Sequence, residues 1–165
     1  MAFANRPRLI VLDEPTTGLD VTTQAHGAVD GARARSRARR RGASTSATTS
    51  PSSRALARRV AVMYAGRVVE LGLAEELFES SAHPYTRRLV GAIPRLTGGR
   101  SLLGIPGHAP SPGRRPPGCA SLPAARCTSR ECDADVPPLL PVGPEHSARC
   151  IRAREVVTET QATSR

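Results

Sequence analysis

Aromatic residues are nearly absent from this chain of 165 residues, which has no Trp, two Phe and two Tyr. A hydrophobic core must therefore be built mainly from Leu, Val, Ile and Ala. The 15 Pro and 14 Gly add to a composition in which large regions bury too little apolar surface to fold. This scarcity predicts a small core flanked by segments without regular structure.

Long apolar runs are also missing. No stretch approaches the roughly 20 apolar residues that a membrane-spanning helix requires. The N-terminal residues before Arg6 and Arg8 lack the apolar region of a secretory signal peptide. We therefore expect a cytoplasmic protein with no transmembrane segment of its own, in which the four Cys are metal ligands or thiols in preference to disulfides.

Acidic residues are outnumbered, since 24 Lys and Arg face 14 Asp and Glu and the formal net charge is +10. Such a balance favours nucleic acid or an anionic membrane surface as partner. Residues 33–41 carry a block of Arg within residues 26–55, where no periodicity is visible, so we expect this middle segment to be disordered. It is either an arginine-rich arm of a small nucleic-acid-binding protein or a solvated insertion.

One apolar run ends in two adjacent carboxylates. Residues 9–12 are Leu-Ile-Val-Leu, followed by Asp13, Glu14 and Pro15, a pattern typical of a buried strand in a parallel sheet that stops at the proline. Open α/β sheets place ligands at the carboxyl ends of their strands. Asp13 is therefore positioned to hold a hydrated Mg²⁺, and Glu14 to act as general base towards a water molecule.

The full string L-I-V-L-D-E-P-T-T-G-L-D at residues 9–20 closely resembles the Walker B strand, catalytic glutamate and D-loop of ABC transporter ATPases. The resemblance implies that Asp13 associates with the Mg²⁺ of bound ATP and that Glu14 is the hydrolytic base. It also implies that Asp20 reaches across a dimer with a second ATPase subunit. Such subunits dock on membrane permease subunits, at the inner face of the plasma membrane, and couple ATP hydrolysis to substrate uptake.

The ATPase pattern is incomplete in this chain. There is no G-x-x-x-x-G-K-S/T phosphate loop, no L-S-G-G-Q-like signature and no switch histidine. Without the phosphate loop a triphosphate lacks its principal anchor. We therefore expect the chain to be a C-terminal fragment that is inactive alone, although its family consists of enzymes.

Residues 26–55 interrupt the resemblance. A one-base shift in the codons of residues 47–53 permits H-D-L-A-V-V, which resembles the switch-histidine segment of ABC ATPases at the expected distance from Asp20. The family pattern returns from Arg59. We interpret the interval as the product of two compensating frameshifts, which would make much of the positive charge accidental, so that no nucleic-acid partner is expected.

The next segment alternates between strand and helix patterns. Residues 60–69 predict a β-hairpin that turns at Ala65-Gly66, and residues 73–80 predict a short helix. The string H-P-Y-T-x-x-L-x-x-A-I-P at residues 83–94 resembles the oligopeptide/dipeptide branch of ABC importers. Tyr85 and Leu89 would share one helix face and serve in packing.

A Pro-rich and Cys-rich extension follows, beginning with I-P-G-x-x-P-S-P at residues 105–112, which again resembles that branch and predicts irregular loop. The spacing C-x7-C-x4-C-x17-C is not that of a zinc finger. It resembles the cysteine-bearing tail of dipeptide importer ATPases, some of which bind a 4Fe–4S cluster, although that pattern has its second Cys nearer Ala125. The candidate ligands are Cys119, Cys127, Cys132 and Cys150; reduced thiols, or a separate Cys-based metal-binding module, are the alternatives.

The expected fold class is therefore α/β, a partial P-loop ABC ATPase domain with a disordered Arg/Ser-rich middle and an irregular Pro/Cys-rich extension. His83 is expected to be structural and His146 to be a solvated loop residue. We expect a Walker B and D-loop remnant at residues 1–25 and a frame-shifted, disordered middle at 26–55. The end of the ATPase domain is expected at 56–98, the transporter extension at 99–151 and a disordered tail at 152–165.

Overall fold

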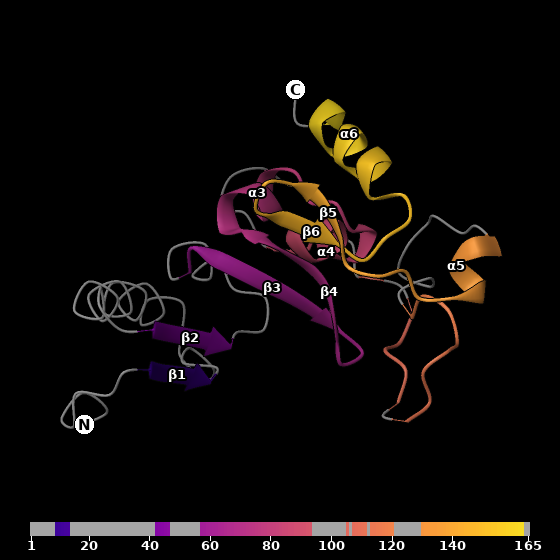
Figure 1. The fold of residues 1–165 in the computed structure, drawn as a ribbon, viewed down its shortest axis with the longest axis horizontal. Helices are drawn as coiled ribbons and strands as arrows, with labels where there is room; N and C mark the ends of the chain where they lie inside the picture. Colours follow the sequence, from indigo (N-terminus) through magenta and orange to yellow (C-terminus); the bar gives the residue numbers. More distant parts are fainter. Residues whose placement is uncertain are drawn as a thin grey trace. The chain divides into compact units, whose positions relative to one another are not determined.

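The computed structural model describes residues 57–93, 105, 107–111, 113–120 and 130–163, and the backbone of two strands at 9–13 and 42–46. The described elements form a mixed arrangement of helices and sheets (Figure 1). The chain divides into two compact units, Met1–Arg58 and Arg59–Arg165. None of the described helices is long and apolar enough to cross a membrane.

The first unit contains a pair of parallel strands, β1 (Leu9–Asp13) and β2 (Gly42–Ser46), in register from Leu9 opposite Gly42 to Asp13 opposite Ser46. The predicted strand at residues 9–12 is confirmed. The prediction that residues 26–55 lack regular structure is wrong for β2. Its small residues have little intrinsic strand preference. The strand is stabilised by pairing with the apolar β1, which the local sequence of residues 42–46 does not indicate.

The second unit is built on a β-hairpin of β3 (Arg59–Tyr64) and β4 (Arg67–Leu73). The turn residues Ala65 and Gly66 have φ values of 48° and 73°. Positive φ at both positions is what a two-residue turn needs to match the right-handed twist of its strands. The hairpin and its turn are as the sequence predicted.

Two further strands, β5 (Leu140–Gly143) and β6 (His146–Ala148), extend this hairpin into an antiparallel sheet of order β3-β4-β6-β5. Together with helix α5 (Arg130–Ala134), they show that an entirely irregular extension was the wrong prediction. Pro141 lies in β5, an edge strand, which is where a sheet tolerates a residue without an N–H group. Residues 107–111 and 113–120 do form irregular backbone and turns, as their composition predicted.

Helices α3 (Ala74–Glu79) and α4 (Pro84–Gly91) pack on one face of the sheet. The core of this layer is formed by buried Val62, Val69 and Leu77, with Tyr85 and Leu89 packed against it. The short helix and the packing role predicted for Tyr85 and Leu89 are confirmed.

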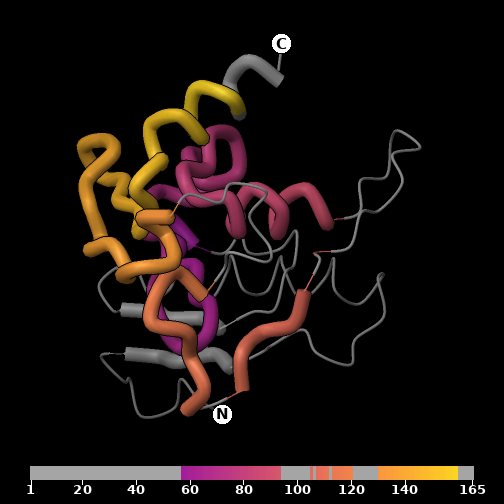
Figure 2. Tube along the Cα trace, turned by 90° about the vertical axis from the view of Figure 1, so that its right-hand side faces the viewer, coloured from indigo at the N-terminus to yellow at the C-terminus, as the bar shows by residue number. Residues whose placement is uncertain are grey.

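The C-terminal helix α6 (Ala153–Thr163) corrects the prediction of a disordered tail. Ala153 packs with Ala82 and Ala148 in a second buried cluster. An ion pair of 3.0 Å between Arg87 and Glu159 also joins α4 to α6. Figure 2 shows α6, in yellow, beside the helices of residues 74–91. Burial of Ala153 and Val156 against the rest of the unit stabilises this helix, although its sequence has no strong periodicity.

Candidate functional site

The residues predicted to bind and hydrolyse ATP begin at the end of β1. Asp13 is the last residue of this strand and lies opposite Ser46 of β2, so a carboxylate-bearing residue does stand at the carboxyl end of a parallel strand pair. The side chain of Asp13, together with Glu14 and Asp20, lies outside the described part of the chain. The arginine block at residues 33–41 lies outside it too.

Two of the predicted cysteine ligands approach each other through their backbones. The N–H of Cys119 donates to the carbonyl oxygen of Cys132 over 2.7 Å. A β carbon at Gly118 would collide with the carbonyl oxygens of Cys132 and Asp133, so a glycine at this position permits the close approach of the loop to α5. Cys132 is buried, whereas Cys119 is half-buried.

The other two cysteines do not complete a ligand set in the described structure. Cys150 is half-buried and packs against the Ala82 and Ala148 cluster, while Cys127 lies outside the described residues. Among the residues that the structure describes, no three His, Cys, Asp or Glu side chains lie close enough to hold a metal ion. The three thiols in the described part of the chain, Cys119, Cys132 and Cys150, therefore do not form a ligand set for an iron–sulfur cluster.

A buried polar centre, consisting of Glu70, His83 and His146, connects the sheet to α4. The Glu70 side chain is fully buried, and its Oε1 accepts hydrogen bonds from the N–H of Ala82 (2.6 Å) and from His146 Nε2 (2.7 Å). Its Oε2 accepts from the N–H of His83 (3.1 Å). The expectation that His146 is a solvated loop residue is wrong, because it lies in β6 and is 6% exposed.

His83 caps the N-terminus of α4, where its Nδ1 accepts a hydrogen bond from the N–H of Tyr85 over 3.1 Å. Burial lowers the pKa of His83 to about 4, against the opposing effects of the Glu70 carboxylate and a hydrogen bond to the backbone of Arg149. Its imidazole is therefore neutral near pH 7. The structural role expected for His83 fits this geometry.

The polar centre links β4 and β6 to the start of α4, because both oxygens of Glu70 accept hydrogen bonds from protein donors. Sequence reasoning missed Glu70 and the burial of His146. A single Glu within the apolar strand of residues 68–71 was a usable signal, because a buried carboxylate needs partners. The partner histidine 76 positions further along the chain carried no local signal.

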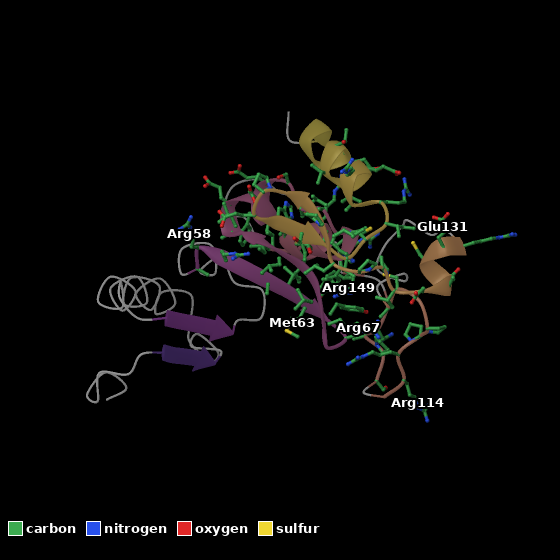
Figure 3. All side chains as sticks on the ribbon, in the orientation of Figure 1. Arg58, Met63, Arg67, Arg114, Glu131 and Arg149 are labelled. Atoms are coloured by element: carbon green, nitrogen blue, oxygen red, sulfur yellow. The ribbon has the colours of Figure 1, made fainter. Side chains whose placement is uncertain are left out.

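A small pocket lies at the turn end of the hairpin, with room for about one water molecule in a cavity of about 20 Å³. Tyr64 and Arg67 of the hairpin, Arg115 and Cys119 of the loop before α5, and Arg149 contribute to its wall. Figure 3 shows Arg67 and Arg149 at this end of the hairpin.

Residues 69–132, from β4 to α5, match the protein family described as the oligopeptide/dipeptide transporter, C-terminal region. The matched stretch includes Glu70 and His83 of the polar centre, and Cys119, Cys127 and Cys132. The resemblance to this transporter branch that the motifs indicated is therefore confirmed.

Curated relatives extend the similarity to nearly the whole chain. A peptide import ATP-binding protein of Brucella ovis is 39% identical over 163 residues, which is 94% of this chain and 48% of that protein. The oligopeptide transport ATP-binding protein OppD of Mycobacterium tuberculosis is 40% identical over 164 residues, which is 98% of this chain and 26% of OppD. A second peptide import ATP-binding protein, from Brucella abortus, is 38% identical over 152 residues, 91% of this chain and 45% of that protein. The chain thus spans about half the length of the Brucella relatives and about a quarter of OppD.

Proposed function

We propose that this chain is part of the ATP-binding subunit of a peptide-type ABC importer, which couples ATP hydrolysis to substrate uptake. The observation that carries the proposal is the similarity, at 39% identity along 94% of the chain, to a protein named for peptide import and ATP binding. The family match at residues 69–132 supports the same transporter branch independently of the ATPase motif.

In this function Asp13 holds the Mg²⁺ that accompanies ATP, Glu14 draws a proton from the attacking water, and Asp20 reaches the second ATPase subunit. The position of Asp13 at the end of the parallel strand β1 supports these roles. The neighbouring strand β2 ends at Ser46, directly before the codons whose shifted frame would encode a histidine.

The proposed partners are a second ATPase subunit and membrane permease subunits at the cytoplasmic face of the membrane. A 4Fe–4S cluster on Cys119, Cys127, Cys132 and Cys150 belongs to the same resemblance, and no step of the reaction is assigned to it. Anaerobic purification followed by assays for iron and acid-labile sulfide tests the cluster directly. Stoichiometric iron that is lost in a Cys132→Ser variant would support it, and iron-free protein would contradict it.

ATP hydrolysis tests the proposed catalytic role. The purified chain is assayed with Mg²⁺ and ATP, alone and after mixing with a fragment of the Brucella ovis relative that comprises the portion this chain does not match. We expect no saturable hydrolysis by the chain alone, since it has no phosphate loop, and hydrolysis by the mixture.

In the mixture, Glu14→Gln should lower the hydrolysis rate by about 100-fold or more, which is the usual contribution of a general base. The matched control is Glu75→Gln, which removes an exposed carboxylate from the first turn of α3. If the two variants hydrolyse ATP equally fast, Glu14 is not the catalytic base.

A further inference from the structure

The pocket at the turn end of the hairpin has a one-sided charge. Its lining includes Arg67, Arg115 and Arg149, and the described residues of the wall include no aspartate or glutamate. The three arginines come from three separate segments: the start of β4, the loop at residues 113–120, and the residue after β6. The fold therefore gathers positive charge here, and no described residue of the wall supplies a compensating carboxylate.

Arg149 is held in place by the protein itself. Its Nε donates to the carbonyl oxygen of Val68 (2.9 Å) and its Nη1 donates to that of Pro137 (3.0 Å). Its backbone N–H also donates to the carbonyl of Val69 (2.8 Å). The two side-chain bonds occupy two of the five N–H donors of the guanidinium. The remaining donors belong to a fixed group, so little conformational entropy would be lost if they bound a ligand.

Arg115 approaches the hairpin turn closely. A β carbon at Gly66 would collide with its Nη2 atom, and Gly66 also has a φ of 73°. The glycine therefore permits both the positive φ of the turn and the close approach of the Arg115 side chain. This close approach brings the Arg115 guanidinium to the same end of the hairpin as Arg67.

Arg67 and Arg115 are exposed, and neither forms an ion pair within the described residues. Arginine side chains that line one pocket repel one another unless an anion lies between them. A planar guanidinium presents paired donors that match the oxygens of a phosphate group, which is why arginine clusters favour phosphate recognition.

We propose that Arg67, Arg115 and Arg149 form a binding site for a phosphate group at the mouth of this pocket. The cavity of about 20 Å³ is too narrow to enclose a phosphate, so the ligand sits on the arginines and not inside. Free inorganic phosphate and the phosphodiester headgroup of an anionic lipid share this chemistry. The proposed site shares no residue with the carboxylates proposed for ATP hydrolysis, and the proposal does not depend on them.

Isothermal titration of the full chain with inorganic phosphate provides the first test. The double variant Arg67→Gln/Arg115→Gln is compared with Arg114→Gln/Arg154→Gln, which removes the same charge from exposed positions outside the pocket. Figure 3 shows Arg114 pointing away from the hairpin. Far-ultraviolet circular dichroism verifies that both variants stay folded; Arg149 is left unchanged because it bonds to the sheet.

We expect saturable binding that weakens at least about tenfold in the pocket variant, because it loses the charge-assisted hydrogen bonds of two guanidinium groups. The control variant should bind as the unmodified chain does. The second test measures flotation with phosphatidylcholine vesicles that contain or lack phosphatidylglycerol.

Pocket-specific loss of phosphate binding identifies a small anion as the ligand, and pocket-specific loss of flotation with phosphatidylglycerol vesicles identifies a lipid headgroup. Either result supports the site. Equal losses in the pocket and control variants, or an unmodified chain that binds neither probe, would overturn it.

Discussion

Replacing Glu70 with alanine removes the acceptor shared by three buried donors. The N–H groups of Ala82 and His83 and the Nε2 of His146 lie 2.6, 3.1 and 2.7 Å from its oxygens. Each buried donor left without a partner costs about 1–3 kcal/mol. The three donors of Ala82, His83 and His146 together therefore cost at least about 3 kcal/mol. We therefore expect Glu70→Ala to lower the free energy of unfolding by about 3–5 kcal/mol.

The two tyrosines of the chain make this loss measurable. Tyr64 and Tyr85 are its only tyrosines, there is no Trp, and their ring centroids lie 4.5 Å apart in the core beside the polar centre. Urea unfolding followed by tyrosine fluorescence therefore reports on this unit, and the midpoint urea concentration should fall by roughly 1–5 M. Glu75→Ala, at an exposed position of α3, is the matched control and should cost less than about 1 kcal/mol. If Glu70→Ala is no less stable than Glu75→Ala, the polar centre does not stabilise the fold.

Three further predictions concern the same unit. Because burial lowers the pKa of His83 from 6.5 to about 4, the unfolded chain binds a proton that the folded chain does not in this range, so the free energy of unfolding should fall by about 3 kcal/mol as the pH drops from 6.5 to 4. His83→Asn, which keeps a capping oxygen, should remove that contribution in urea titrations at each pH, and an unchanged slope would contradict the assignment. Leu77→Ala, at a side chain 2% exposed, should lower the free energy of unfolding by about 2–5 kcal/mol, whereas Met63→Ala, at 57% exposed, should change it by less than about 0.5 kcal/mol; equal losses would contradict the described core. Gly66→Ala should cost about 1–2 kcal/mol in the same assay, through its positive φ and the collision with Arg115, and a neutral result would count against the turn geometry.

The elements that could be predicted from the sequence are those with a local signal. The hairpin follows from alternation around Ala65-Gly66, and β1 follows from four apolar residues that stop at Pro15. The pairing of β4 with β6 was not predictable, because Glu70 meets Ala148 across 78 positions of chain. Such pairing depends on tertiary packing, which local propensity does not encode.

The candidate sites also differ in whether the local sequence indicates them. Asp13 and Glu14 are neighbours in a motif, so the sequence alone names them. The arginine site depends on side chains from positions 67, 115 and 149, which only the folded sheet and its loop bring together. His146 was misjudged for the same reason, since its burial comes from a partner on a distant strand.

Sequencing the gene from well upstream of the first codon through codon 60 tests most directly whether the chain is part of a longer importer ATPase subunit. If it is, the upstream frame is continuous and encodes G-x-x-x-x-G-K-S/T and a signature motif, and a shifted frame near codon 47 restores a histidine and an aspartate. An upstream frame closed by stop codons, together with codons 26–55 that read as given, would contradict it. The catalytic roles of Asp13 and Glu14 would then have no nucleotide site to serve.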